Sequence, residues 1–232
     1  MSRAKPLISV VIPAYNGETF LEQAIESVLA QTWQRTELVV VDDGSTDRSA
    51  EIAGSYPVRL VRQENSGVAA ARNRGVDEAE GELVSFLDQD DLLRPEKLER
   101  QLESLLAEPE AGMSSCQMKI FLEPGCPVPD WIDPGLLGRE IHTLHLGTIL
   151  AWRRTFEQVG RFDDSYRWGN DTDWFMRSRE AGVPIVRVNE ALMLYRVHEE
   201  NESLRVGSPV TQDTLSAVLA SVRRRRARLD DA

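Results

Sequence analysis

The chain has 232 residues, of which 41% are hydrophobic, which is enough apolar material for one substantial core but marginal for two. Acidic residues outnumber basic residues by 38 to 27, so the formal net charge is -11 and a general affinity for nucleic acid is not expected. Two cysteines, Cys116 and Cys126, do not make a disulfide framework of the secreted kind, and we expect free thiols in a reducing compartment.

The N-terminal segment MSRAKPLISVVIPAYNG is expected to lead into a first strand. Basic residues precede a short apolar run, but Pro13 and the lack of a small-residue cleavage site argue against a signal peptide. No apolar run approaches the roughly 18 residues that a membrane span needs. We therefore expect a soluble or at most peripheral protein.

The first hundred residues alternate between strand-like and helix-like segments, which is typical of an α/β domain with a mainly parallel sheet. The run from Leu38 to Val41 is apolar on both faces, as a strand buried on both sides requires. Strands are predicted at residues 7–15, 36–45, 58–63 and 82–88, and helices at residues 18–32, 46–56 and 67–81.

The second half is less regular. Its predicted helices lie at residues 95–109, 170–182 and from 209 to the end. Its predicted strands lie at 113–123 and as a pair within 183–198, and residues 146–166 are expected to form a strand that leads into a short helix. The segment from Pro124 to Arg139 is rich in proline and glycine, so we expect a loop that covers or borders a site.

Polar residues follow each of the first four predicted strands, in the segments PAYNG, DDGSTD, NSGVAAARN and LDQDD. In open α/β sheets, ligands bind beyond the carboxyl ends of the strands. Asp88, Asp90 and Asp91 fall within four positions, where they repel one another and lower stability unless a cation or a donor-rich ligand lies among them. The alternative is a strand-end turn and helix cap, which would use only one or two of these acids.

In order and spacing, seven segments of the chain resemble the inverting glycosyltransferases of family 2. They are ISVVIPAYNG, ELVVVDDGSTD, GVAAARNRG, GELVSFLDQDDLL, GTILAWRRTFEQVGRFDDSY, GNDTDWFMR and YRVHEEN, and they reach to about Asn201. The resemblance implies the GT-A fold, an α/β Rossmann-like architecture with a mainly parallel central sheet and helices on both faces. It also implies one domain over residues 1–208, with a nucleotide-binding half at 1–98 and an acceptor-binding half at 99–208, followed by a C-terminal helix at 209–232.

The resemblance implies a metal site in which Asp88, Gln89 and Asp90 form the DxD motif. Asp90 would ligate a divalent ion, Mn²⁺ or Mg²⁺, and Asp88 would reach the ribose or a metal-bound water. Such an ion neutralises the charge that develops on a nucleoside diphosphate leaving group. His198 lies where many relatives have a histidine near the metal or diphosphate, and Mn²⁺ tolerates this ligand better than Mg²⁺ does. A packed or solvated histidine is the alternative.

The resemblance also implies donor-binding residues at the first strand ends. The residues that correspond to the nucleotide-holding positions are Pro13, Ala14, Tyr15 and Asp43. Asp43 would accept the imide proton of uracil, which makes a UDP-sugar the expected donor, while Asp42 is structural or faces the ribose. Helix capping is the alternative for both acids. Arg72 would reach the diphosphate through its guanidinium fork, or lie exposed to solvent.

Inverting transfer is a single displacement, so a carboxylate must take the proton of the acceptor hydroxyl. In the resemblance Asp171 has this place, at the start of a helix, and Asn170 stands where glutamate is common. Because asparagine cannot share charge with Asp171, Asp173 is the second candidate for the base. Both acids acting only as helix N-terminal residues is the structural alternative.

Aromatic faces stack on sugar rings, so we expect Trp168, Trp174 and His145 on the acceptor side, with core packing as the alternative for the tryptophans. The basic run from Arg223 to Arg226 indicates contact with an anionic membrane or with a protein partner. A solvated helix end is the alternative.

Together these features predict a metal-dependent inverting glycosyltransferase that moves a sugar to a carbohydrate, lipid-linked or peptide acceptor. We expect it in the cytoplasm, with peripheral contact at the inner face of the membrane as the alternative. A glycine-rich phosphate loop of the nucleotidyltransferase or dinucleotide type is absent after the first strand. A nucleotide-sugar-binding module that has lost catalysis through Asn170 is the competing hypothesis.

Overall fold

The computed structural model describes residues 5–129, 132–199, 201 and 209–230, and within them nine strands form one sheet. The strands are β1 Ile8–Ala14, β2 Thr36–Asp42, β3 Arg59–Arg62, β4 Leu83–Phe86, β5 Leu92–Leu93, β6 Met113–Leu122, β7 Glu140–Ile141, β8 Ile149–Trp152 and β9 Ile185–Val197. The helices are α1 Leu21–Leu29, α2 Ser49–Gly54, α3 Val68–Glu78, α4 Lys97–Ala107, α5 Arg153–Val159, α6 Asn170–Glu180 and α7 Pro209–Asp230. Two short 3₁₀ helices lie at Pro134–Leu136 and Leu146–Thr148.

The strand order is β3-β2-β1-β4-β8-β6-β9-β5, with β7 paired to β6. Strand β1 pairs in parallel with β2 and β4, and β2 pairs in parallel with β3, so these strands all end at one edge of the sheet. The second half is mixed, because β8 runs antiparallel to β4 and β6 while β9 runs parallel to β6. The predicted mainly parallel sheet is therefore confirmed, and the second half adds antiparallel pairs of β8 with β4 and β6 and of β5 with β9.

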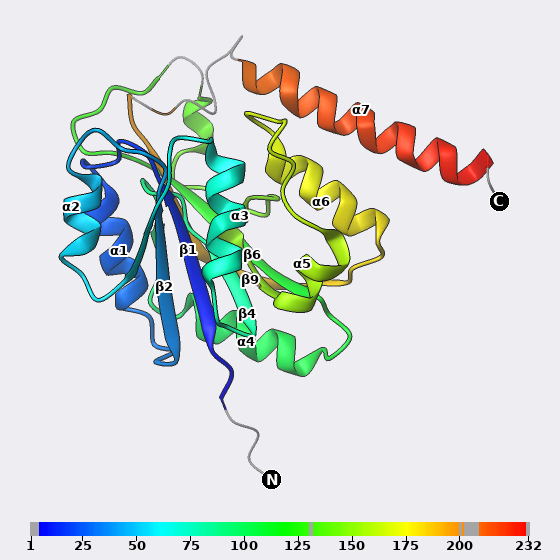
Figure 1. Cartoon of the computed structure of the whole chain (residues 1–232), viewed down its shortest axis with the longest axis horizontal. Coiled ribbons are helices and arrows are strands. Elements are labelled where there is room, and N and C mark those ends of the chain that lie inside the picture. The colour runs from blue at the N-terminus through cyan, green and yellow to red at the C-terminus, as the bar shows by residue number, and fades with distance from the viewer. Residues whose placement is uncertain (1–4, 130–131, 200, 202–208, 231–232) are drawn as a thin grey trace.

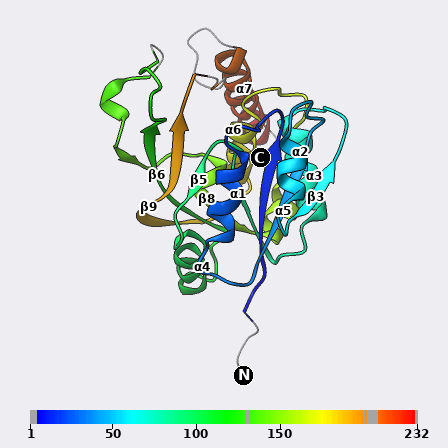
Figure 2. The same cartoon turned by 90° about the vertical axis from the view of Figure 1, so that its left-hand side faces the viewer.

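Helices cover both faces of the sheet (Figures 1 and 2). Along β1, Ile8, Val10 and Ile12 pack in one cluster with the apolar sides of α1, α2 and α4, and Val11 packs on the opposite face with α3, α5 and α6. This alternation follows from the two-residue period of a strand. Helix α7 lies outside these layers, packs against α6 and extends away from the body of the molecule (Figure 1).

A close approach of α3 to β1 fixes the height of α3 above the sheet. A Cβ atom on Gly75 would lie 2.2 Å from Cγ1 of Val11, so only glycine permits this contact. Arg72, three residues earlier, lies almost one helical turn nearer the strand ends. The segment AARNRG thus sets where the Arg72 side chain emerges.

One predicted boundary is wrong. Residues 183–198 were expected to form two strands, but β9 is continuous from Ile185 to Val197. Its pairing with β6 shifts register between Ser115 and Met118, so β9 pairs in two stretches separated by an irregularity. The polar pair Asn189 and Glu190, which suggests a turn in the sequence, lies at this irregularity and is exposed.

The predicted C-terminal helix is confirmed as α7. Among the described residues, none of the helices combines the length and apolarity that crossing a bilayer requires.

Candidate functional site

The loops after β1 and β4 are joined at the carboxyl edge of the sheet. The backbone N–H of Tyr15 donates to Oε1 of Gln89 at 2.8 Å, and Nε2 of Gln89 donates to the Tyr15 carbonyl at 3.1 Å. Pro13 and Ala14 are buried at the end of β1, whereas Tyr15 is 47% exposed. A Cβ on Gly17 would meet Oε1 of Gln89 at 2.3 Å, so this glycine makes room for the contact. The structure therefore brings four of the predicted donor residues together.

The Asp43 carboxylate, only 3% exposed, organises the loop before α3. Its Oδ1 accepts from the side chain of Gln63 at 2.7 Å and from the N–H of Ser66 at 2.9 Å, and its Oδ2 accepts from the N–H of Gly67 at 2.8 Å. Asp42 instead accepts from the N–H of Ser45 and from Arg62. Neither acid caps α2, because that helix begins at Ser49, where Asp47 accepts the backbone N–H.

Arg72 connects the two halves of the chain. Its Nη2 donates to Oδ1 of Asp88 at 2.9 Å, and its Nη1 donates to Oδ1 of Asn170 at 2.8 Å. The side chain is buried rather than solvated, and its Nε has no hydrogen-bond partner in residues 5–129, 132–199, 201 and 209–230. Asp88 follows β4 and Asn170 begins α6, so one guanidinium holds the predicted diphosphate region next to the helix that carries the predicted base.

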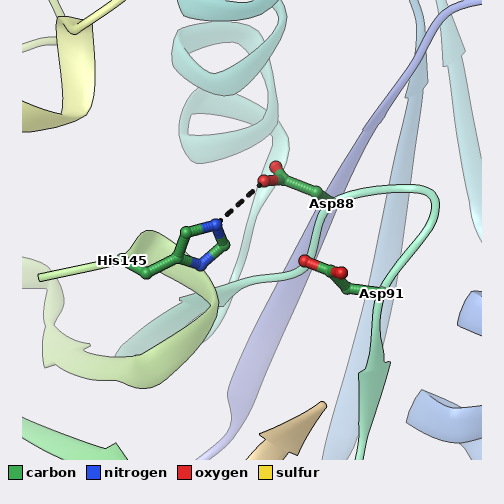
Figure 3. A group of neighbouring side chains, drawn as sticks. All are labelled: Asp88, Asp91 and His145. Carbon is green, nitrogen blue, oxygen red and sulfur yellow. Dashed lines mark ion pairs between the residues drawn. The ribbon is translucent and has the colours of Figure 1, made fainter. Parts of the chain in front are cut away.

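Asp88 also faces His145, which lies just before β8. The Nε2 atom of His145 is 3.5 Å from Oδ2 of Asp88, and Asp91 lies beside them (Figure 3). Burial by itself would raise the pKa of Asp88, but the positive charge of Arg72 and the electrostatic interaction with His145 outweigh it, and the pKa is lowered. Asp88 is therefore held as a carboxylate.

Ligand atoms of Asp88, Asp91 and His145 lie within 4.8 Å of one another, which is compatible with a metal ion. However, Nδ1 of His145 accepts the N–H of Gly147 at 3.1 Å, which places the imidazole proton on Nε2. In that tautomer Nε2 is a donor toward Asp88 and not a metal ligand. His145, expected only on the acceptor side, thus lies next to Asp88 of the predicted DxD motif.

Asp91 is buried and lies behind the motif. Its Oδ1 accepts the backbone N–H of Arg196 at 2.8 Å, while its Oδ2 is buried and has no hydrogen-bond partner among the described residues. Burial, together with the negative charges of Asp90 and Asp88, raises the pKa of Asp91 well above its usual range. An unsatisfied carboxyl oxygen at this position leaves the cluster short of positive charge or donors.

The predicted ligands Asp90 and His198 lie together. Nε2 of His198 is 3.0 Å from Oδ2 of Asp90, and the Phe20 ring packs 4.6 Å from the imidazole centroid. Arg196 was not singled out in the sequence, yet its Nε donates to the Asp90 carbonyl at 2.7 Å and its side chain is ion-paired with Glu123. Arg196 stands two residues before His198, and that spacing is the only sequence signal for its role.

Asp171 and Asp173 lie on different sides of α6. Within the part of the chain that the structure describes, Oδ1 of Asp171 accepts only from its neighbour Thr172, and the side chain is partly exposed. Asp173 is 2% exposed and is ion-paired with Arg177 at 2.7 Å and with Arg224 at 3.2 Å. The structure thus leaves Asp171 accessible and places Asp173 in a buried ionic contact with α7.

The two tryptophans also differ. Trp168 is partly exposed, and its backbone N–H donates to Asp213 of α7 at 3.1 Å. Trp174 is 0% exposed, stacks on Phe156 at 4.9 Å and donates from Nε1 to the Gly160 carbonyl. As placed, Trp174 packs in the core between α5 and α6 and offers no face to an acceptor.

Comparison with known proteins identifies the chain. The sequence model of glycosyl transferase family 2 matches residues 9–170. The chain belongs to glycosyl transferase family 2. It is 37% identical over 212 residues to the putative teichuronic acid biosynthesis glycosyltransferase TuaG of Bacillus subtilis, covering 85% of this chain and 81% of TuaG. It is 33% identical over 208 residues to an uncharacterized glycosyltransferase of Rickettsia typhi, where the match covers 84% of this chain but 65% of the relative.

The family membership agrees with the fold. The crystal structure of S. aureus TarS 1-349 in complex with UDP matches with a TM-score of 0.67 and 25% sequence identity, over 82% of this chain and 60% of that chain. The predicted α/β fold of the GT-A type is therefore confirmed. The family model ends at the residue where α6 begins, so the contacts of α6 with α7 lie beyond it.

Proposed function

We propose that this family 2 member transfers a sugar from a nucleoside diphosphate donor, with UDP as the nucleotide, to an acceptor hydroxyl with inversion at the anomeric carbon. One observation carries the proposal: Arg72 holds Asp88, after β4, next to Asn170, at the start of α6. The diphosphate region and Asp171 therefore share one site. Family membership supports glycosyl transfer, and the similarity to TarS crystallised with UDP supports the choice of nucleotide.

The nucleotide is proposed to bind in the half formed by residues 1–98, and the acceptor in the half formed by residues 99–208. A carboxylate offers about four lone-pair sites. Asp43 uses three of them for its contacts with the loop before α3, so one remains for the imide N–H of uracil. Tyr15, exposed beside the buried Pro13 and Ala14, has a ring face available for the base, and Gln89 holds the loop that carries it.

Asp90, Asp88 and His198 are proposed to hold a divalent cation, Mn²⁺ or Mg²⁺. The residues fit: a carboxylate and an imidazole lie 3.0 Å apart, a mixed set that suits Mn²⁺, and the buried Oδ2 of Asp91 beside them lacks a partner. When bound, the cation supplies positive charge to the departing diphosphate. Arg72 contributes a fixed positive charge to the same region, because Asn170 does not neutralise it.

Asp171 is proposed as the general base that takes the proton from the acceptor hydroxyl. Its carboxylate is partly exposed at the first turn of α6, whereas the alternative, Asp173, is occupied by two arginines. Asn170 is engaged by Arg72, so its replacement of the usual glutamate leaves Asp171 in place. This contact favours an active enzyme over a binding module without catalysis.

The acceptor is proposed to be a carbohydrate, lipid-linked or peptide hydroxyl, with Trp168 and His145 on its side of the site. Trp174 would act there only indirectly, by packing beneath α6. We propose a cytoplasmic location, which the free thiols of Cys116 and Cys126 support because reduced cysteines persist in reducing compartments.

The outward face of α7 is proposed to make peripheral contact with an anionic lipid surface. Leu215 and Leu219 are exposed on it, and Arg223 and Arg226 follow on the same side of the helix. Apolar side chains beside arginines on one helical face suit the interface of an anionic bilayer. The arginines from Arg223 to Arg226 form a local positive charge on a chain whose net charge is -11.

The test is turnover. The protein with Mn²⁺, a panel of acceptors and UDP-glucose, UDP-galactose or UDP-N-acetylglucosamine should release UDP, and Asp171→Ala should not, although it still binds UDP. Binding of UDP without turnover of any donor would favour the binding module. A fully active Asp171→Ala would refute the assignment of the base.

A further inference from the structure

Helix α7 is anchored on α6 by a buried contact. Ala217 and Ser221 of α7 are fully buried, and Ser221 donates to Glu180 at the end of α6 at 2.5 Å. The two helices in this contact are the last two of the chain, and Figure 1 shows α7 lying along the outer side of α6. The opposite side of α7 carries the exposed Leu215 and Leu219.

The contact is centred on one arginine of the basic run. Arg224 pairs through Nη1 with Oδ1 of Asp173 at 3.2 Å and through Nε with Oε2 of Glu180 at 2.8 Å. The side chains of Asp173 and Glu180 are only 3% and 4% exposed. Carboxylates that are buried to this extent require compensating charge, and Arg224 supplies it to both. Arg223 and Arg226, by contrast, are exposed.

A second contact joins the beginning of α7 to the residues just before α6. Oδ2 of Asp213 accepts the backbone N–H of Trp168 at 3.1 Å. Gly169 has φ +72°, and a Cβ there would lie 3.0 Å from the backbone N and Cα of Thr214. The chain therefore enters α6 through a left-handed glycine pressed against α7, two residues before Asp171.

We propose that α7 is a positioning element for the catalytic helix, and that Arg224 and Asp213 are positioning residues that fix the first turn of α6 and with it the Asp171 carboxylate. The inference rests on the proposed function of Asp171 as the base. The C-terminal helix lies outside residues 9–170, which match the family model, and under this proposal it supports catalysis by holding α6 in place. General-base catalysis depends on this placement, because a shift of about 1 Å at a reacting group lowers the rate by up to about 100-fold.

Arg224→Gln tests the proposal, with Arg100→Gln, at an exposed position of α4, as the control that removes the same charge. With a soluble acceptor and no lipid, we expect Arg224→Gln to lower kcat about 10-fold while the KM for the donor and the affinity for UDP change less than about 2-fold. Arg100→Gln should match the wild type. Equal kcat values for the two variants would overturn the proposal, as would a loss of UDP affinity as large as the loss of kcat.

Hydrogen exchange of the unliganded protein provides a readout that does not depend on turnover. In Arg224→Gln the amides of residues 170–176 should exchange faster, while those of β1 and β4 keep their protection. If the wild type shows no transferase activity, the proposed function fails, but the exchange result still decides whether α7 holds α6. Unchanged exchange in residues 170–176 would overturn the proposal.

Should Arg224→Gln fail to fold, Asp213→Ala carries the same test from the other contact. It removes the acceptor of the Trp168 N–H and leaves the Asp173 and Glu180 pairs intact. The expected result is again a lower kcat with an unchanged donor KM, together with faster exchange at the start of α6. An Asp213→Ala variant with wild-type kcat and exchange would refute the positioning role.

Discussion

Arg72 donates a hydrogen bond from Nη1 to Oδ1 of Asn170 at 2.8 Å, across 98 positions of the sequence. The same guanidinium pairs with Asp88 at 2.9 Å, so its orientation depends on both halves of the chain. Asn170 is uncharged, and the positive charge of Arg72 is therefore balanced within these contacts by Asp88 alone. Arg72 therefore attracts an anionic diphosphate. A second carboxylate at position 170 would reduce this attraction.

Replacing Arg72 by lysine is therefore expected to reduce catalysis strongly. A single ammonium group cannot reproduce the two directed contacts with Asp88 and Asn170. We expect Arg72→Lys to lower kcat/KM by about 100-fold, through weaker diphosphate binding and a displaced α6. Steady-state kinetics with a UDP-sugar measures this effect. Arg74→Lys, at an exposed position two residues along α3, is the control and should retain wild-type kinetics; an Arg72→Lys enzyme as fast as this control would contradict the role of the fork.

The two acids of α6 should respond differently to neutralisation. Asp171→Asn removes the proposed base, so kcat should fall by about 10²–10⁴-fold with UDP affinity retained. Asp173→Asn instead weakens the buried pairs with Arg177 and Arg224, and should lower the free energy of unfolding by about 2 kcal/mol, given the partial exposure of both arginines. Kinetics and denaturant unfolding of both variants check this division. If Asp173→Asn lost more kcat than Asp171→Asn while its stability was unchanged, Asp173 would be the base and Asp171 would not.

The sequence indicates which strands and helices form the site more clearly than it indicates which side of each helix faces the site. The acids from Asp88 to Asp91 could be placed at a sheet edge because strand order and period determine where a buried strand ends. Asp171 and Asp173 could not be separated, because residues two apart on a helix point about 200° apart and the covering element, α7, lies some forty residues later. Trp168 and Trp174 flank Asp171 in the sequence, but this position does not show that Trp174 is buried, because its burial depends on packing against Phe156.

Two contacts of single side chains, one local and one over a long sequence distance, were also beyond prediction. The tautomer of His145 follows from the N–H of Gly147, and this contact depends on the 3₁₀ turn that begins at Leu146. The hydrogen bond of Arg196 to the Asp90 carbonyl joins residues 106 positions apart and depends on the pairing of β9 with β5 next to the motif. It leaves no local pattern in the sequence, because it arises only when the second half of the chain packs against the first.

A buried lysine in the core gives a pH-dependent stability. Lys97 is 0% exposed, donates to Oγ of Ser85 at 3.0 Å, and burial lowers its pKa from 10.5 to about 8. Between these values the unfolded chain binds more protons than the folded one, so the free energy of unfolding should rise as the pH increases from about 8 to 10.5. The rise from this group is about 3 kcal/mol, at 1.36 kcal/mol per pKa unit.

Lys97→Met should remove this contribution, because methionine fills a similar volume and does not titrate. Below pH 8 the variant is expected to be at least as stable as the wild type, since a charged amine no longer has to be buried. Urea unfolding of both proteins between pH 7 and 10.5 measures the difference in slope. Parallel curves for the two proteins would show that Lys97 does not titrate in this window.

Vesicle binding tests the proposed lipid contact of α7. The protein should sediment with vesicles that contain phosphatidylserine and not with phosphatidylcholine vesicles, and the binding should weaken as salt screens the arginines. The double variant Arg223→Gln, Arg226→Gln should lose most of this binding, at about 1 kcal/mol for each arginine. Arg48→Gln with Arg100→Gln removes the same charge from exposed positions elsewhere, and should bind as the wild type does. Equal losses in both double variants would attribute the binding to total charge and not to α7.

The pair of Asp90 and His198 predicts a stabilisation by UDP that depends on metal. Ligand binding to the folded state stabilises it, by about 2.7 kcal/mol when the free ligand concentration is 100 times Kd, and so raises the midpoint temperature of thermal unfolding. UDP with Mn²⁺ should therefore stabilise the wild type more than UDP alone, because a cation held by Asp90 and His198 would supply positive charge to the diphosphate. His198→Ala should lose most of this metal-dependent increment, while His142→Ala, at an exposed histidine paired with Asn189, should keep it. A wild-type midpoint that responds to UDP equally with Mn²⁺ and with a chelator would refute the metal site while leaving the nucleotide site intact.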